Sequence, residues 1–140
     1  MMADIASSCR DEVFDFHALL ELWLRGTLSR EDPRSVRLTG VLAGDCRFVT
    51  PGGNVESGPA LGERLLRAHG SQPDLRIVIE DFAMVAGWSS AALVRYVERR
   101  VCGRQATARF STVLFRRWLD APSGVVWQHI HETWVAGEGI

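Results

Sequence analysis

Apolar and polar residues follow a helical period in the first half of the chain. In the first periodic segment, the apolar residues that recur three and four positions apart are Val13, Phe16, Leu20 and Leu24. This spacing predicts an amphipathic helix. Ser8 is a favourable N-cap and Gly26 a favourable stop, so we expect the helix to run from about Ser8 to Gly26.

Two shorter helices and a hairpin follow before the pattern changes. Asp32-Pro33, an N-cap residue followed by proline, predicts a helix that runs to about Gly44. Residues 47–56 are typical of a short hairpin, because two short β-type runs flank a turn rich in proline, glycine and asparagine. Ser57-Gly58-Pro59 then predicts a third helix, which Gly70 closes.

After Pro73 the pattern becomes that of strands. Four long β-type runs follow, each separated from the next by a compact turn: Leu75–Val85, Ala92–Val101, Ala106–Trp118 and Val125–Val135. Helices ahead of hairpin-linked strands predict an α+β fold, with a curved antiparallel sheet wrapped around N-terminal helices. No repeat or linker divides the sequence, so we expect a single domain over residues 1–140 with a core of about 10–136.

Composition narrows the classes of partner. Hydrophobic residues make up 46% and charged residues 24% of the 140 residues, as in globular domains. The net charge of −1 argues against a nucleic-acid partner, and no apolar run approaches the ~20 residues that span a bilayer. Cys9, Cys46 and Cys102 are an odd, scattered set, which argues against a disulfide scaffold. With no secretory signal visible, these features predict a cytoplasmic protein without a membrane partner.

Strand alternation gathers polar side chains on one face of the expected sheet. Residues two apart on a strand point the same way. If consecutive strands pair as hairpins, the residues that share this face are Tyr96, Glu98, Arg109, Ser111, Trp127, His129 and His131. A buried charge needs a partner, so we expect Glu98 to pair with Arg109. His17, on the first helix, could also face this set.

Four segments of the sequence resemble the nuclear transport factor 2-like superfamily, also called SnoaL-like or cystatin-like. They are Phe48–Gly53, Arg95–Glu98, Ala108–Thr112 and Trp127–Trp134, of which the terminal His-x-His-Glu-Thr-Trp word is the most specific and is similar to an uncharacterised bacterial subgroup. The likeness in element order covers about residues 10–136. It implies a cone-shaped α+β barrel with an internal pocket, usually in a homodimer. It implies no single reaction, because the superfamily includes isomerases, dehydratases, cyclases and non-catalytic binders.

Binding of an unidentified small molecule is the first function that we consider for the expected pocket. The residues that we predict to contact the ligand are Glu98, Arg109, Ser111, Trp127 and Trp23. A two-histidine, one-carboxylate metal site made by His129, His131 and Glu98 is an alternative. We predict no metal, because Arg109 competes for Glu98, and no nucleotide cofactor, because no glycine-rich fingerprint is present.

Two other functions stay open. One is a cofactor-independent lyase or isomerase in which His129 or His131 acts as the base and Tyr96 donates to a developing oxyanion. The base-and-oxyanion residues of the ketosteroid isomerases have no matching motif in this sequence. The other is a non-catalytic structural or regulatory homodimer, for which Trp118 and Trp134 on the outer strand faces would suit the interface.

Overall fold

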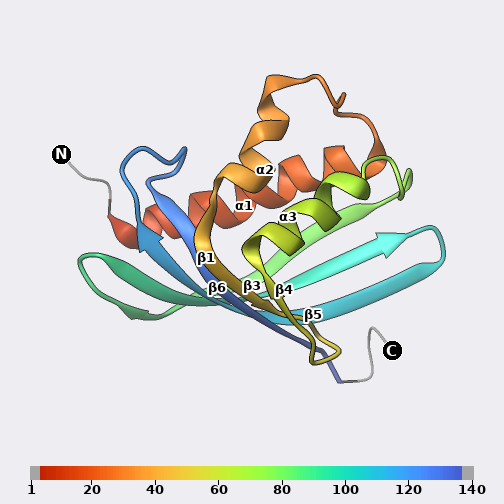
Figure 1. Cartoon of the computed structure of the whole chain (residues 1–140). Coiled ribbons are helices and arrows are strands. Elements are labelled where there is room, and N and C mark those ends of the chain that lie inside the picture. Colours follow the sequence, from red (N-terminus) through yellow and green to blue (C-terminus); the bar gives the residue numbers. More distant parts are fainter. Residues whose placement is uncertain (1–3, 137–140) are drawn as a thin grey trace.

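Helices occupy the first half of the chain, as the helical period predicts. The computed structural model describes residues 4–136. Within this range the helical elements are α1 (Ile5–Arg25), a 3₁₀ turn (Pro33–Val36), α2 (Arg37–Gly40) and α3 (Gly58–Arg67). All of them lie on one side of the sheet, as Figure 1 shows.

The strands form one curved sheet under these helices. Their bounds are β1 (Leu42–Val49), β2 (Val55–Ser57), β3 (Arg76–Gly87), β4 (Ala91–Cys102), β5 (Gln105–Arg117) and β6 (Val125–Trp134). The order across the sheet is β2-β1-β6-β5-β4-β3. The four long strands coincide with the four predicted runs to within two residues at each end, and the α+β fold is confirmed.

One strand pairing departs from the prediction of an antiparallel sheet. Strand β1 runs parallel to β6, with Phe48 opposite Ile130, so the sheet is mixed. The predicted second helix, to about Gly44, is also too long, because α2 ends at Gly40 and β1 begins at Leu42. The pairing of β1 joins residues more than 80 positions apart, which local periodicity does not report.

Side-chain caps fix the starts of the 3₁₀ turn and of α3. The Asp32 side chain accepts a hydrogen bond from the Arg34 amide, and the Ser57 hydroxyl does the same for the Ala60 amide (3.2 Å). The predicted start of α1 at Ser8 is wrong. Helix α1 starts at Ile5, and Ser8 is a buried residue of its second turn, with its amide bonded to the Asp4 carbonyl.

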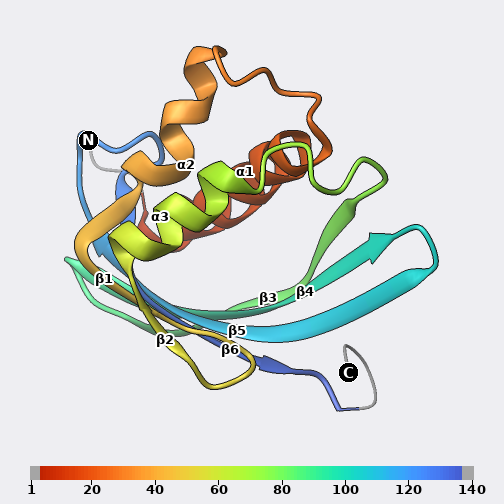
Figure 2. The same ribbon diagram turned by 45° about the vertical axis from the view of Figure 1, so that its right-hand side comes forward.

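The sheet bends around α1 (Figures 1 and 2). The hydrophobic core lies between them. Residues in the interior include Val13, Leu20, Trp23, Val94, Val113, Phe115 and Trp127, all at most 2% exposed. Strand β3 carries two register shifts against β4, and Asp81, which lies within the first of them, has a φ of 57°. Such bulges increase local twist, so they help β3 follow the curvature.

The fold buries two of the three cysteines. Cys9 and Cys46 are fully buried free thiols, and burial raises the pKa of Cys9 to about 12 and that of Cys46 to about 11. Neither thiol is therefore a nucleophile near neutral pH.

Among residues 4–136, no helix is both long and apolar enough to cross a bilayer.

Candidate functional site

A cavity of about 220 Å³ lies between α1, α3 and the concave face of the sheet. One part of its wall is apolar and includes Phe16, Leu20, Leu24, Phe48, Leu61, Trp127 and Ile130. The other part is polar and contains His17, Arg64, Tyr96, Glu98, Arg100, Arg109 and Glu132. The cavity reaches the surface at Arg64, whose side chain is 48% exposed and paired with Glu56.

Strands β4 and β5 place their polar residues on this wall as alternation predicts. Tyr96 lies opposite Ser111, and Glu98 lies opposite Arg109. Tyr96, Glu98 and Arg109 line the cavity, whereas Ser111 is fully buried just behind it. Both strands have an unbroken alternation over these residues, so their predicted faces are correct.

The predicted position of His129 and His131 on this face is wrong. Phe115 pairs with Trp127 but the preceding Leu114 pairs with His129, so Gln128 is an extra residue on β6. Such a bulge reverses the alternation. Trp127 therefore points inward while His129 and His131 are exposed on the outer face, and the inward positions beyond the bulge belong to Ile130 and Glu132.

The two predicted tryptophans have different positions. Trp127 forms part of the cavity wall and packs against Phe16 and Phe115, with ring centroids 5.0 and 4.6 Å away. Trp23 is not among the lining residues. It lies between α1 and α3, where its indole N–H donates to the Leu65 carbonyl (2.7 Å).

Glu98 contacts Arg100 and His17. The prediction that it pairs with Arg109 is wrong. The Nε of Arg100 donates to Glu98 Oε2 at 2.5 Å, and His17 Nε2 lies 3.2 Å from Glu98 Oε1. Burial acts to raise the pKa of Glu98, but Arg100, His17 and Arg109 together bring it far below the ordinary value. Glu98 is therefore an ionised carboxylate.

His17 is oriented by a second bond on its other nitrogen. Its Nδ1 lies 2.7 Å from the Val13 carbonyl, an acceptor, so Nδ1 carries a hydrogen. The other nitrogen, Nε2, then faces the Glu98 carboxylate, and this buried contact joins α1 to β4 at the cavity wall.

Arg109 and Glu132 form a looser pair across β5 and β6. The Arg109 Nη1 to Glu132 Oε1 distance is 3.3 Å, and the Ser111 hydroxyl donates to Glu132 Oε2 at 2.8 Å. Burial, and next the Glu98 charge, raise the pKa of Glu132, and Arg109 and Ser111 offset this only in part. Among residues 4–136, the buried Nε of Arg109 has no hydrogen-bond partner.

Tyr96 completes the polar wall as a hydrogen-bonding group. It is 1% exposed, and burial raises its pKa well above the ordinary value, with Glu98 and Glu132 adding to the effect and Ser111 opposing it through a hydrogen bond. Its hydroxyl therefore stays protonated and can donate.

A separate buried carboxylate supports the wall from behind. Glu12, fully buried on α1, accepts from the Trp127 indole N–H (2.9 Å) and from Arg37 Nη2 (2.7 Å). Arg37 also donates to the Ser123 hydroxyl at 3.1 Å. This cluster connects α1, α2, β6 and the β5–β6 turn, and it fixes the orientation of Trp127.

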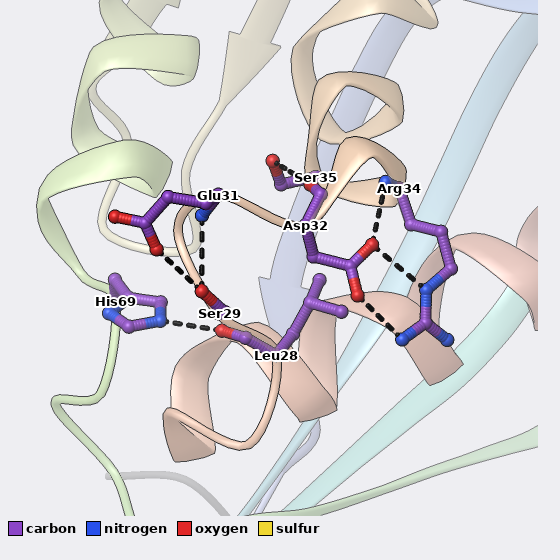
Figure 3. A network of polar contacts seen from close by, with 7 residues as sticks. All are labelled: Leu28, Ser29, Glu31, Asp32, Arg34, Ser35 and His69. Carbon is purple, nitrogen blue, oxygen red and sulfur yellow. Dashed lines mark hydrogen bonds and ion pairs between the residues drawn. The ribbon is translucent and has the colours of Figure 1, made fainter.

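The connection after α3 closes the end of the cavity near Leu24 and Gln72. The Gly70 and Gln72 amides donate to the Trp23 and Leu24 carbonyls at the end of α1 (3.1 and 2.9 Å). In Figure 3, His69 from this connection bonds the Leu28 carbonyl at 2.7 Å, next to the Ser29–Glu31 pair.

Asp32 organises the loop between α1 and the 3₁₀ turn. Figure 3 shows its carboxylate receiving bonds from the amide and guanidinium of Arg34. These exposed contacts order the α1–α2 loop, but none of them belongs to the cavity wall.

Sequence reasoning missed three polar residues of the wall, Arg64, Arg100 and Glu132. Arg100 lies two positions from Glu98 on β4 and shares its face, so alternation was a sufficient signal. Glu132 had no such signal, because its face depends on the bulge at Gln128. Among residues 4–136, no group of three or more His, Cys, Asp or Glu side chains is placed to hold a metal.

Comparison with solved structures supports the fold. An NTF-2 like protein of unknown function from Pseudomonas aeruginosa is 29% identical, with a TM-score of 0.83 over 92% of this chain and 99% of its own. The CaMKII hub of S. rosetta is 15% identical (TM-score 0.67; 96% and 100% covered), and a ketosteroid isomerase-like protein from Parabacteroides distasonis is 11% identical (TM-score 0.62; 89% and 86% covered). The last two show likeness of fold alone.

Comparison of sequences identifies the family to which the chain belongs. "Sucrose-phosphatase 2" of Nicotiana tabacum is 26% identical over 129 residues, which are 90% of this chain. The chain spans only 30% of the length of that relative. The family model described as "Sucrose-6-phosphate phosphohydrolase C-terminal" matches residues 9–136. The chain therefore belongs to the sucrose-6-phosphate phosphohydrolase C-terminal family, and its fold is nuclear transport factor 2-like.

Proposed function

We propose that this protein binds a small molecule in the cavity between α1, α3 and the concave sheet. The observation that supports this most directly is a 220 Å³ space whose wall is part apolar and part densely polar. Ligand sites commonly combine an apolar lining with a few convergent polar groups. Within the part of the chain that the structure describes, Arg109 on this wall also has a buried Nε without a hydrogen-bond partner.

The size of the cavity limits the ligand. At ~30 Å³ per water molecule, 220 Å³ corresponds to about seven waters, below the 300–1,000 Å³ typical of drug-sized ligands. The tobacco relative is a sucrose-phosphatase. A whole disaccharide phosphate would exceed this space, so a sugar ligand would have to be a monosaccharide or only part of a larger molecule.

A fragment screen by ligand-observed NMR, covering small acids, bases, neutral aromatics and sugars, tests the proposal. Ala68, the residue that follows the last turn of α3, lines the cavity, whereas Ala60 in the first turn of this helix is exposed. Binding should weaken in Ala68→Phe, which fills the cavity, and persist in Ala60→Phe. If no fragment binds the native protein, or if both variants bind like the native protein, the proposal fails.

Acid–base catalysis is a second candidate, supported by the raised pKa of Glu132 beside an apolar wall. A carboxyl group whose pKa lies closer to neutral is suited to proton transfer. In this scheme Glu132 takes the place predicted for His129 and His131, and Tyr96 donates to the developing negative charge. Hydrogen–deuterium exchange of carbon acids that bind in the screen tests it. Exchange at the same rate with Glu132→Gln as with the native protein would exclude this role.

A homodimer is the third proposal, supported by the outer face of the sheet. This face carries the exposed side chains of Phe110, His129, His131 and Thr133, and no helix of residues 4–136 covers it. The CaMKII hub shares the fold. Light scattering after size-exclusion chromatography should give twice the chain mass, and Phe110→Arg should give a monomer. A native monomer would contradict this proposal.

A further inference from the structure

Arg109 keeps hydrogen-bond donors to spare at one end of the cavity. Its guanidinium carbon lies 5.0 Å from the centre of the Trp134 ring, which covers one face of the group. Its buried Nε has no partner within the described residues, and its bond to Glu132 is long at 3.3 Å. A guanidinium recognises a carboxylate through two donors in its plane, so this group is arranged for an acceptor that the protein itself does not fully supply.

The neighbouring charges leave Glu132 as the carboxylate that bonds Arg109. The titratable groups that line this wall are His17 on α1, Arg64 on α3, Tyr96, Glu98 and Arg100 on β4, Arg109 on β5 and Glu132 on β6. Glu98 is already bonded to Arg100 and His17. Arg64 is bonded to Glu56. A ligand acid group entering here would therefore compete with Glu132 alone.

We propose that the cavity binds a small organic carboxylate with a short apolar body, whose acid group replaces Glu132 on Arg109. This inference rests on the proposed binding function and names the ligand class for that site. The apolar body would lie against Phe16, Leu20 and Ile130, which line the same cavity. A cationic ligand is disfavoured, because it would meet the unpaired edge of Arg109.

Displacement of Glu132 has a consequence for protons. Once Arg109 bonds the ligand, Glu132 keeps the Ser111 hydroxyl and loses its nearest positive charge. The pKa of Glu132 is already raised by burial and by Glu98, and loss of Arg109 raises it further. Glu132 then takes up a proton from solvent, and the affinity for the carboxylate rises as the pH falls, until the ligand itself is protonated.

Three isosteric probes separate charge from shape: benzoate, benzamide and benzamidinium. Calorimetric titration of the whole protein should give benzoate an affinity about 10- to 100-fold above that of benzamide, the range for hydrogen bonds to a charged group. Benzamidinium should bind more weakly than both. Inorganic phosphate serves as a fourth probe, and tighter binding of phosphate than of benzoate would overturn the assignment to carboxylates.

Variants assign the effect to the two residues. Arg109→Gln should remove the preference for benzoate over benzamide, and Arg109→Lys should retain only part of it. Glu132→Gln should bind benzoate at least as tightly as the native protein and without pH dependence. Arg95→Gln, an exposed arginine of β4, is the matched control and should change nothing. Should Arg109→Gln fail to fold, Arg109→Lys and Glu132→Gln carry the test.

Titration in two buffers of different ionisation enthalpy measures the protons taken up. Native protein should take up a fraction of a proton, at most one, per benzoate, and Glu132→Gln none. Equal binding of benzoate and benzamide, or benzoate binding that Arg109→Gln leaves intact, overturns this inference while the cavity remains a binding site. Absence of binding by any probe and any screened fragment overturns the proposed function as well.

Discussion

Removing the Glu12 carboxylate should strongly destabilise the fold. In Glu12→Ala the Trp127 indole N–H and the Arg37 guanidinium both lose their acceptor. Loss of one partner costs about 1–3 kcal/mol for a buried neutral donor and about 3–5 kcal/mol for a buried ion pair. The Arg37 side chain is 22% exposed and can partly reach water, so the lower end applies. We expect a total of about 4 kcal/mol, a large part of the 5–15 kcal/mol of a typical domain.

Glu12→Gln tests how much of this effect depends on charge. Burial is the main reason that the pKa of Glu12 is raised, with Trp127 and Arg37 opposing it. A carboxyl with a raised folded-state pKa adds stability at low pH that is lost as the pH rises through that pKa. The stability of native protein relative to Glu12→Gln should therefore decrease as the pH rises.

Urea denaturation followed by far-UV circular dichroism measures both variants without depending on Trp127 fluorescence. Glu63→Ala, which removes a surface glutamate with a 74% exposed side chain, is the control and should leave the midpoint unchanged. A loss below about 1 kcal/mol in Glu12→Ala, the typical cost of any single substitution, would refute the idea that this cluster anchors Trp127.

Three further predictions concern acid stability, the bulge and the thiols. The pKa of Glu98 is lowered on folding, so its stabilising effect is present above the unfolded-state pKa and is lost on acidification. Glu98→Gln should therefore flatten the fall in melting temperature below about pH 5. An unchanged fall would contradict this prediction. Deleting Gln128 should restore plain alternation with the same inward residues, so the variant should fold with a loss of about 1–2 kcal/mol; an unfolded product would contradict its role as the extra residue. Cys9 and Cys46 should resist iodoacetamide at pH 8 in the folded protein, whereas half-buried Cys102 should react faster, as mass spectrometry of peptides would record.

Most of the fold could be predicted because its determinants are local. Helical spacing, caps such as Asp32 and Ser57, and turns between long β-type runs all act over a few residues. The part that could not be predicted is the parallel pairing of β1 with β6, since Phe48 and Ile130 are distant in sequence. Nothing in the period of either strand indicates its neighbour.

In the candidate site, strand alternation predicts the faces of some residues correctly and fails for others. Alternation places Tyr96, Glu98 and Arg109 correctly, because β4 and β5 pair without interruption. It fails for His129 and His131 because one extra residue reverses the faces of β6. The partners in the ion pairs were also predicted wrongly. Strand register brings Glu98 opposite Arg109, but side-chain direction and a third partner from α1 decide which atoms bond.

The two halves of the polar wall have different physical roles, and stability measurements can separate them. Glu98 is ionised, bonded to Arg100 and His17, and it ties α1 to β4, so its removal leaves a half-buried arginine unpaired. Arg109 contributes one long bond, and its buried Nε has no partner in the described part of the chain, so its own desolvation is poorly compensated. Arg109→Gln should therefore cost far less stability than Glu98→Gln, since Glu132 can accept a proton and keep Ser111. A group whose removal leaves folding nearly unaffected but alters ligand preference is retained for binding. Equal destabilisation by the two substitutions would instead make Arg109 part of the folding network.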